Sequence, residues 1–241
     1  MALDSPQPKI VVLTGAGVSA DSGIQTFRGA GGLWEGHDVT EVASPEGFAA
    51  NPELVLRFYN ERRAQMKACE PNAGHLALVE LEQAFDVLIV TQNVDNLHER
   101  AGSSAIIHLH GELSKARSVK NEHLVVDMEG DIQLGDLGED GEQLRPHIVW
   151  FGEAVPEIYR AAEQMAQADI IIIIGTSLAV YPAAGLVDYA QPSVPIFVVD
   201  PNEVPMYTAN EVIHIQEKGA VGVPKLVQEL LSAKDSESSS S

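Results

Sequence analysis

Residues 9–32 read KIVVLTGAGVSADSGIQTFRGAGG, and this stretch decides the fold of the chain. Its first apolar run, 10–13, is continuous, which predicts a strand that is covered on both faces of a sheet. A Gly-Ala-Gly turn at 15–17 follows at once, and such small residues let a phosphate approach the backbone. We predict that residues 19–22 begin a helix whose N-terminus faces this turn, as in parallel α/β sheets that bind a pyrophosphate. A tight turn without a ligand is the alternative at this point.

The composition narrows the class of protein. The 241 residues include 15 basic and 35 acidic side chains, for a net charge of -20. This charge disfavours nucleic acid and anionic membranes as partners, although solubility alone accounts for most of it. Cys69 is the one cysteine of the sequence, which excludes an internal disulfide and fits a reducing, cytoplasmic compartment. The longest aliphatic block, 170–174, has the length of a buried strand and is too short for a membrane span.

Polar residues follow the predicted strands where each strand ends. The strand at 85–91 runs directly into Gln92, Asn93 and Asp95. Because ligands bind at the carboxyl ends of parallel strands, we expect this polar cluster to face the same crevice as the glycine turn. A local Asx turn would explain the same residues without a ligand. The strand at 169–177 ends in small polar residues and offers a second place where the backbone can approach a ligand.

Two histidines lie near the end of another predicted strand, 105–109. Strand alternation places His108 and His110 on one face of the sheet. They form either a metal pair or one working imidazole beside one structural imidazole. A metal ion would need further ligands that converge from elsewhere, and the sequence shows no obvious ones.

The segment at 33–66 reads mostly helical, with helix starts at Ser44 and Asn51, each followed by proline. In the second of these helices Tyr59 and Arg62 are three residues apart and share a face. The two side chains either line a pocket or pack as a ring beside a snorkelling cation. Spacing alone leaves both interpretations open.

Three other segments combine few apolar residues with glycine or charge. The glycine-rich stretch 29–32 predicts a mobile cover over the ligand, or a simple linker. The acidic stretch 114–145 predicts an inserted subdomain built as a hairpin that turns at 128–130. Its carboxylates lack the spacing of a calcium loop, so a solvated acidic face is favoured over a cation site. After the last strong strand, 195–200, we expect a terminal helix that ends before residue 234, followed by a disordered tail.

Five motifs follow one another along the chain: GAGVSADSGIQTFRG, TQNVDNLH, HLHGEL, FGE and GTS. In this order they resemble the sirtuin family of NAD-dependent protein lysine deacylases, over residues 9–231. The resemblance implies an α/β fold with a Rossmann-like parallel sheet, helices on both of its faces, and a smaller inserted module made of a helical segment and a hairpin. It also implies NAD as the cofactor, acylated proteins as the partners, and nicotinamide and O-acyl-ADP-ribose as products.

Matched by position, the motifs of the family imply roles for single residues of this chain. His110 matches the position of the general base of the family. The resemblance also implies that Asn93 and Asp95 supply oriented polar groups at the reacting ribose. Residues that the resemblance assigns to NAD are Gly15, Ala16, Gly17, Phe27, Arg28, Gln92, Asn93, Asp95, His110, Gly175, Thr176, Ser177, Asp200, Gly219 and Ala220. Residues that it assigns to the peptide backbone, which would bind by strand addition, are Val149, Phe151 and Gly152.

The chain departs from the pattern of the family at two places. Most members carry a four-cysteine zinc site in the small module, whereas here Ser118 and Asn121 replace the first pair and the second pair is missing. The resemblance therefore implies a zinc-free hairpin and no metal site. Asp200 stands where many relatives have asparagine. A carboxylate there still accepts from ribose hydroxyls and disfavours a 2'-phosphate, which favours NAD over NADP.

Tyr59 and Arg62 match the Tyr-x-x-Arg of the sirtuin subgroup that removes acidic acyl groups such as succinyl and malonyl. That resemblance implies that Arg62 binds the distal carboxylate and that the Tyr59 hydroxyl is a second donor. Ala43 stands where the subgroup keeps its pocket wide, and acetyl is a second candidate group. The rival functions are a protein ADP-ribosyltransferase and a non-catalytic NAD-sensing interaction module.

We expect a single domain over residues 1–241 that combines a large dinucleotide-binding part with a small module. The large part is expected to comprise 9–32, 71–113 and 147–232, the small module 33–70 and 114–146, and the disordered tail 233–241.

Overall fold

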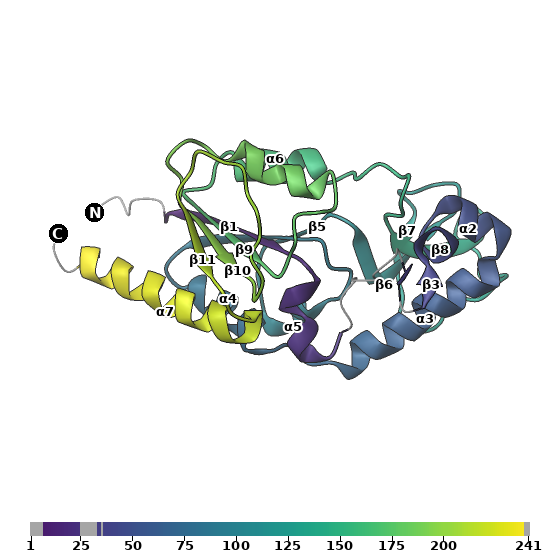
Figure 1. Cartoon of the computed structure of the whole chain (residues 1–241). Helices are drawn as coiled ribbons and strands as arrows, with labels where there is room; N and C mark the ends of the chain where they lie inside the picture. Colours follow the sequence, from purple (N-terminus) through teal and green to yellow (C-terminus); the bar gives the residue numbers. More distant parts are fainter. Residues whose placement is uncertain (1–6, 25–32, 35, 239–241) are drawn as a thin grey trace, which may run out of the picture.

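A computed structural model of the chain describes residues 7–24, 33–34 and 36–238. Its larger part is built on a six-stranded parallel sheet, and its smaller part contains a three-stranded antiparallel sheet (Figure 1). The predicted α/β class with a second, smaller part is therefore confirmed. Among the described helices, none combines the length and the apolarity needed to cross a bilayer.

The large sheet has the strand order β11-β10-β9-β1-β4-β5. Its strands are β1 Lys9–Thr14, β4 Asp86–Thr91, β5 Ile106–His108, β9 Ile170–Ile174, β10 Ile196–Val199 and β11 Val212–Ile215. This is the order of a Rossmann-type sheet, in which the two halves of the chain meet at a switch point between β1 and β9. The sequence analysis missed β11, because this edge strand has only four residues and its Val212 and Ile213 are both 38% exposed.

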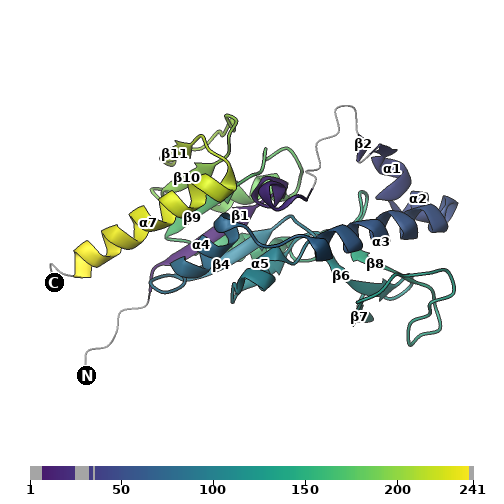
Figure 2. The same ribbon diagram turned by 90° about the horizontal axis from the view of Figure 1, so that it is seen from below.

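Both faces of the large sheet are covered, as the unbroken apolar strands predict. Side chains alternate along β9, so Ile171 packs into one layer of the core and Ile172 into the opposite layer. One layer is closed by α6 and η3, the other by α4 and α7 (Figures 1 and 2). These helices are α4 Ala73–Leu81, α6 Ile158–Met165, η3 Ala183–Tyr189 and α7 Gly219–Ser238.

The helix predicted at 19–22 is wrong. The chain instead forms two single turns of 3-10 helix, η1 Ala16–Val18 and η2 Ala20–Ser22. Tertiary contact decides this, because the Gly17 N–H donates to the Gly175 carbonyl at 2.9 Å and holds the turn against the end of β9. Gly23 then ends η2 with a φ of 94°, in the left-handed region that favours glycine.

The segment before β4 is mostly helical, as predicted, apart from one short strand pair. That pair is β2 Leu33–Trp34 with β3 His37–Asp38, and the helices are α1 Val39–Val42, α2 Pro45–Ala50 and α3 Pro52–Ala68. Both predicted helix starts are confirmed. The Ser44 hydroxyl accepts from the Gly47 N–H at 2.9 Å, and the Asn51 side chain accepts from the Leu54 N–H at 3.1 Å.

The hairpin predicted to turn at 128–130 is also wrong. The small sheet has the order β7-β6-β8, with β6 Gly111–Ser118, β7 Val125–Asp127 and β8 Leu144–Ile148. Residue 127 pairs with Lys115, so β7 turns back onto β6 and not onto the residues that follow it. Ile132 is buried under α3, where its N–H and carbonyl bond the Asn60 side chain at 3.0 and 2.9 Å. The Asn60 side-chain amide thus forms the two backbone hydrogen bonds of Ile132 that a neighbouring strand would otherwise have formed.

The end predicted for the terminal helix is wrong as well, and with it the disordered tail from residue 233. α7 begins at Gly219 and continues to Ser238. The chain has no glycine or proline between Pro224 and Ser238, so nothing in the backbone stops the helix. A further short helix, α5 Leu97–Ala101, was not predicted.

Hydrogen bonds hold the small sheet at the position where the family resemblance places zinc. The Ser118 hydroxyl donates to Asp140 at 2.6 Å and accepts from the Lys120 and Asn121 N–H groups at 3.1 and 3.3 Å. An ion pair between Lys120 and Glu142 links the same two loops. These contacts support the prediction that the module needs no metal.

We expect the purified protein to contain no stoichiometric zinc, and a chelator to leave its Tm unchanged. Ser118→Ala should lower the Tm by about 2–4 °C, because it removes a hydrogen bond worth about 1 kcal/mol. Elemental analysis and thermal unfolding with and without chelator measure these quantities. One equivalent of zinc, or unfolding by the chelator, would show that other ligands replace the missing cysteines.

Candidate active site

A cavity of about 280 Å³ lies between the carboxyl ends of the large sheet and the small part. It contains most of the side chains that the sequence analysis selected. The selected residues that line it are Gly15, Ala16, Gly17, Ala43, Tyr59, Gln92, Asn93, Asp95, His110, Val149, Phe151, Gly152, Gly175, Thr176 and Ser177. The polar cluster after β4 therefore shares one site with the two glycine turns.

Strand register brings these distant segments together. Thr14, Thr91 and Ile174 are direct partners at the ends of β1, β4 and β9. The next residues stay linked, since the Gln92 N–H donates to Thr14 O and the Gly15 N–H donates to Ile174 O, each at 2.9 Å. The cavity consequently lies at the switch point of the sheet, where open α/β sheets bind their ligands.

The two turns pack so closely against each other that neither leaves room for a side chain at the glycine positions of the other. A Cβ on Gly17 would lie 2.5 Å from Gly175 Cα, and one on Gly15 would lie 2.7 Å from Thr176 Cβ. Gly175 also has a φ of 60°. The physical reason for this motif is thus the close approach of the two backbones, in addition to the ligand access inferred from the sequence.

His110 faces the cavity with a defined tautomer. Its Nδ1 lies 3.1 Å from the Gln92 carbonyl oxygen, which can only accept, so Nδ1 carries the proton and Nε2 is the unprotonated nitrogen. Burial lowers the pKa of His110, and the hydrogen bond to Gln92 opposes this only in part. The imidazole is therefore neutral at pH 7 and can accept a proton.

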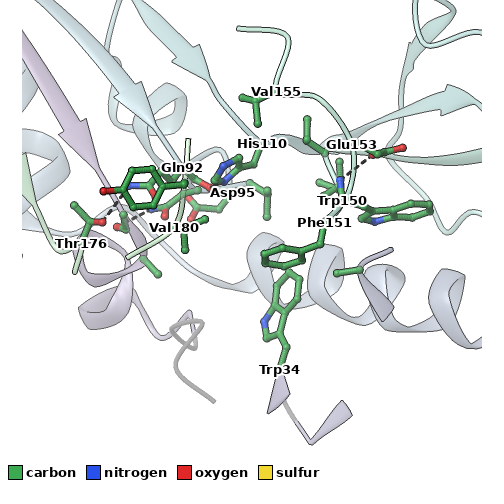
Figure 3. Close-up of a pocket in the computed structure, with 18 of the residues that line it drawn as sticks. Trp34, Gln92, Asp95, His110, Trp150, Phe151, Glu153, Val155, Thr176 and Val180 are labelled. Atoms are coloured by element: carbon green, nitrogen blue, oxygen red, sulfur yellow. Dashed lines mark hydrogen bonds between the residues drawn. The ribbon is translucent and has the colours of Figure 1, made fainter. Parts of the chain in front are cut away.

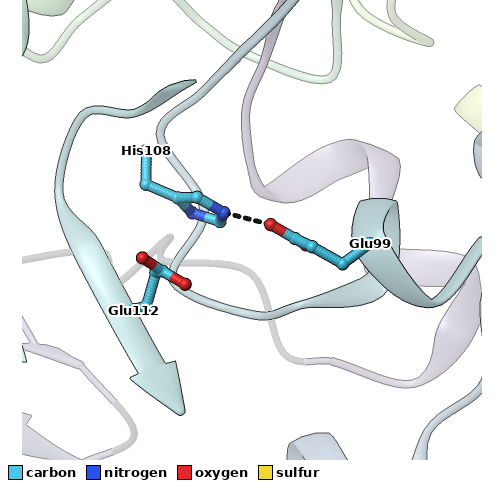
Figure 4. A group of neighbouring side chains, drawn as sticks. All are labelled: Glu99, His108 and Glu112. Carbon is cyan, nitrogen blue, oxygen red and sulfur yellow. Dashed lines mark hydrogen bonds and ion pairs between the residues drawn. The ribbon is translucent and has the colours of Figure 1, made fainter. Parts of the chain in front are cut away.

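His108 has a different environment from His110. Its Nδ1 bonds Asn93 O at 3.3 Å and its Nε2 bonds Glu99 at 2.5 Å (Figure 4). Burial lowers the pKa of His108, but the hydrogen bond and the charge of Glu99 outweigh it, so that the pKa is raised. Glu112 lies close enough to complete a three-ligand group, but it already bonds Lys115 at 2.7 Å. Of the two interpretations left open, this arrangement favours one working and one structural imidazole.

A buried polar network supports the loop after β4. The Asn93 amide lies 3.2 Å from both Gly15 O and Ser19 Oγ. Ser19 in turn lies 3.4 Å from His75 Nε2, and it hydrogen-bonds Asp95. Burial raises the pKa of Asp95, while the hydrogen bonds from Leu97 N–H and Ser19 oppose this rise. The network fixes the side chains of Asn93 and Asp95 before any ligand binds.

The other end of the cavity is aromatic. His110 lies between the polar end, with Gln92 and Thr176, and the end that carries Trp34 and Phe151 (Figure 3). Tyr59 and Trp150 also line this end, and both are buried. Ala43 lies beside them and has the smallest side chain of this group, as expected for a wide pocket.

Several selected residues lie outside the cavity lining. Arg62 donates to Phe58 O at 2.7 Å, with its guanidinium 3.8 Å from the Phe58 ring centroid. Asp200 accepts from the Asn202 N–H at 2.8 Å. Gly219, followed by Ala220, begins α7 behind the first glycine turn, where a Cβ would lie 3.3 Å from Val18 Cα. The remaining two, Phe27 and Arg28, fall outside the described residues.

This geometry agrees with a comparison of the sequence with known families. The profile of the Sir2 family matches residues 15–182. The chain belongs to the Sir2 family. The matched range begins at the first glycine turn and includes the whole loop after β4, His110 and the second glycine turn.

Relatives and solved structures of the Sir2 family match almost the whole chain. An NAD-dependent protein deacylase of Bacteroides thetaiotaomicron is 53% identical over 231 residues, which cover 93% of this chain and 98% of the relative. An NAD-dependent protein deacylase of Vibrio vulnificus is 50% identical over 246 residues, which cover 97% of this chain and 98% of the relative. A Sir2 homolog–NAD complex matches with a TM-score of 0.80 and 37% identity, over 95% of this chain and 91% of that one. A Sir2 protein bound to acetylated peptide matches with a TM-score of 0.74 and 29% identity, over 94% of this chain and 93% of that one.

The polar end of the cavity fits the NAD on which Sir2 deacylases depend. Glycine turns leave the backbone open at the switch point, and ribose hydroxyls can bond the Asn93 amide and the Asp95 carboxylate. The Gln92 side chain bonds the Thr176 hydroxyl at 3.1 Å and so joins the two halves of this end.

Sequence analysis missed part of this Sir2 site. Trp34, Trp150 and Glu153 line the cavity but were not selected. Trp150 and Glu153 flank the selected Phe151 and Gly152, and an aromatic residue next to a predicted binding segment was the available signal. No comparable signal marked Trp34.

Proposed function

We propose that this NAD-dependent protein deacylase acts on lysine side chains that carry acidic acyl groups, such as succinyl and malonyl. The observation that supports the proposal is the Tyr59 hydroxyl, a polar group on a buried side chain at the aromatic end of the cavity. Ala43 lies beside it and leaves room for a group longer than acetyl. Arg62 follows one helical turn later on α3 and supplies a positive charge close to that end.

The residues at the centre of the cavity suit the acyl transfer. When bound, NAD supplies the ribose that receives the acyl group. We assign His110 Nε2 the role of taking the proton from the attacking hydroxyl, because this nitrogen is unprotonated and faces the cavity. Asn93 and Asp95 orient the sugar with side chains that the Ser19 network holds in place. Trp34 and Phe151 exclude water from the apolar side.

The peptide backbone would bind along the segment after β8. The Val149 N–H already donates to His110 O, and the Phe151 N–H already donates to Ala43 O, each at 2.9 Å. A peptide that adds as a strand must therefore use other backbone groups of this segment, such as the Val149 carbonyl and Gly152. The same two bonds tie the peptide segment to the general base and to the acyl pocket.

A panel of acetyl-, malonyl- and succinyl-lysine peptides with NAD tests the proposal. We expect nicotinamide and free O-acyl-ADP-ribose in equal amounts, with larger kcat/KM for the acidic groups. A mass increment retained on the protein or peptide would support an ADP-ribosyltransferase instead. NAD binding without nicotinamide release with any peptide would support a sensing module.

Arg62→Met should lower kcat/KM for the succinyl peptide about 10- to 100-fold more than for the acetyl peptide, since a hydrogen bond to a charged group contributes about 1.5–3 kcal/mol. Burial lowers the pKa of Arg62 to about 10, so the guanidinium is still charged at pH 7. It must leave Phe58 O to reach a carboxylate in the cavity. Arg57→Met, at an exposed position of the same helix, is the matched control. Equal losses for both peptides would leave Arg62 with a packing role.

A further inference from the structure

The Tyr59 hydroxyl makes one hydrogen bond within the described structure, and that bond defines its direction. Trp150 Nε1 lies 3.0 Å from Tyr59 Oη, and both side chains are buried. An indole N–H can only donate, so the phenolic oxygen is the acceptor in this pair. The phenolic proton remains available, because no acceptor for it is found among the described residues.

Burial keeps this proton on the oxygen. It raises the pKa of Tyr59 above its ordinary value of 10, although the hydrogen bond from Trp150 opposes the rise. At neutral pH the Tyr59 hydroxyl is therefore protonated and can donate, and its side chain is one of those that line the cavity. A buried donor without an acceptor is costly, so a ligand that supplies an oxygen there is selected over one that does not.

The indole of Trp150 is itself held from several sides. The Arg145 guanidinium lies 3.2 Å from its ring centroid, and the ring of Phe48 packs at 5.4 Å. The backbone N–H of Trp150 donates to the Glu153 carboxylate at 2.8 Å, and Arg145 donates to the same carboxylate at 2.6 Å. The direction of the indole N–H is thus set by the small part and not by the ligand.

We infer that Trp150 is a positioning residue for acyl recognition: its indole N–H engages the Tyr59 oxygen and directs the phenolic O–H at an oxygen on the far end of the acyl group. The inference rests on the proposed preference for acidic acyl groups. A succinyl or malonyl group has a carboxylate oxygen at its far end, whereas an acetyl group ends in a methyl. The contact therefore distinguishes the two kinds of substrate.

Trp150→Phe tests the inference, because it keeps an aromatic ring and removes the N–H. We compare acetyl and succinyl forms of one peptide in the wild type, Trp150→Phe, Tyr59→Phe and the double variant. Trp150→Phe should lower the succinyl-to-acetyl ratio of kcat/KM about 5- to 10-fold, mainly through KM of the succinyl peptide. In the Tyr59→Phe background the same change should not alter the ratio further.

The ratio does not depend on the fraction of molecules that fold, because both peptides meet the same folded molecules. If Trp150→Phe does not fold at all, Trp150→Met fills the space with a flexible apolar side chain and takes its place. A ratio that stays at the wild-type value, or a loss that persists undiminished without the Tyr59 hydroxyl, overturns the inference. If the wild type does not desuccinylate, the proposed acyl preference is wrong and the inference is wrong with it. A wild type that desuccinylates, with an unchanged ratio in Trp150→Phe, contradicts the inference alone.

Discussion

Replacing His110 with alanine is expected to lower kcat/KM by about 10²- to 10⁴-fold, the range that general acid–base catalysis contributes. The tautomer is the reason, since the hydrogen bond from Nδ1 to Gln92 O leaves Nε2 as the acceptor that faces the cavity. NAD should still bind, because the glycine turns and the Asn93 network do not depend on this imidazole. Steady-state kinetics with an acyl peptide and a calorimetric NAD titration measure the two effects separately.

The pH profile of the wild type gives a second test of His110. Burial holds its pKa below the ordinary value of 6.5, so the base form predominates at pH 7. Protonation removes the base, so kcat/KM should fall at acidic pH with a midpoint below pH 6.5. His123→Ala, an exposed histidine of the small part, is the control and should behave as the wild type. Full activity in His110→Ala, or an acidic limb with its midpoint above pH 6.5, would mean that another group is the base.

Gly17→Ala is expected to destabilise the fold by about 2–3 kcal/mol, in the range of overpacked cores, and to lower the Tm by about 5–10 °C. Its Cβ would lie 2.5 Å from Gly175 Cα and 2.9 Å from Gly175 O. Both are backbone atoms that cannot rotate away, so the turns after β1 and β9 must separate. When the two turns separate, NAD affinity should fall at least about tenfold, since both turns line the polar end of the cavity.

Denaturant unfolding and an NAD titration measure the two effects of Gly17→Ala. Gly130→Ala is the matched control, because a Cβ there meets no atom within 4 Å. It should change the unfolding free energy by no more than about 0.5 kcal/mol. Stability and NAD affinity at the wild-type level in Gly17→Ala would show that the two backbones do not need this close approach.

Local patterns predicted the elements whose signals lie within a few residues. The isoleucines of β9 indicated a strand covered on both faces, and the caps at Ser44 and Asn51 marked two helix starts. Polar residues after β4 indicated the site, because parallel strands end at one edge of a sheet. In each case the deciding interaction is repeated along a strand or closed within one turn of helix.

The errors occurred where a residue from far along the chain decides the local structure. Ile132 belongs to no strand because Asn60, 72 positions away, bonds its backbone. Residues 19–22 do not form an α-helix because the preceding turn is held at Gly175. Local propensity has no information about either partner, and tertiary contacts override it.

The sequence by itself determined the class of the fold, the membership of the Sir2 family and the edge of the sheet that carries the site. Periodic apolar runs and the order of five motifs are enough for these conclusions. Only the tertiary structure decided which side chains meet inside the site. Tyr59 and Trp150 lie 91 positions apart, and their hydrogen bond exists because α3 and the end of β8 pack in one core. Spacing specifies the face that a residue occupies, whereas a hydrogen bond across the cavity depends on the packing of both elements.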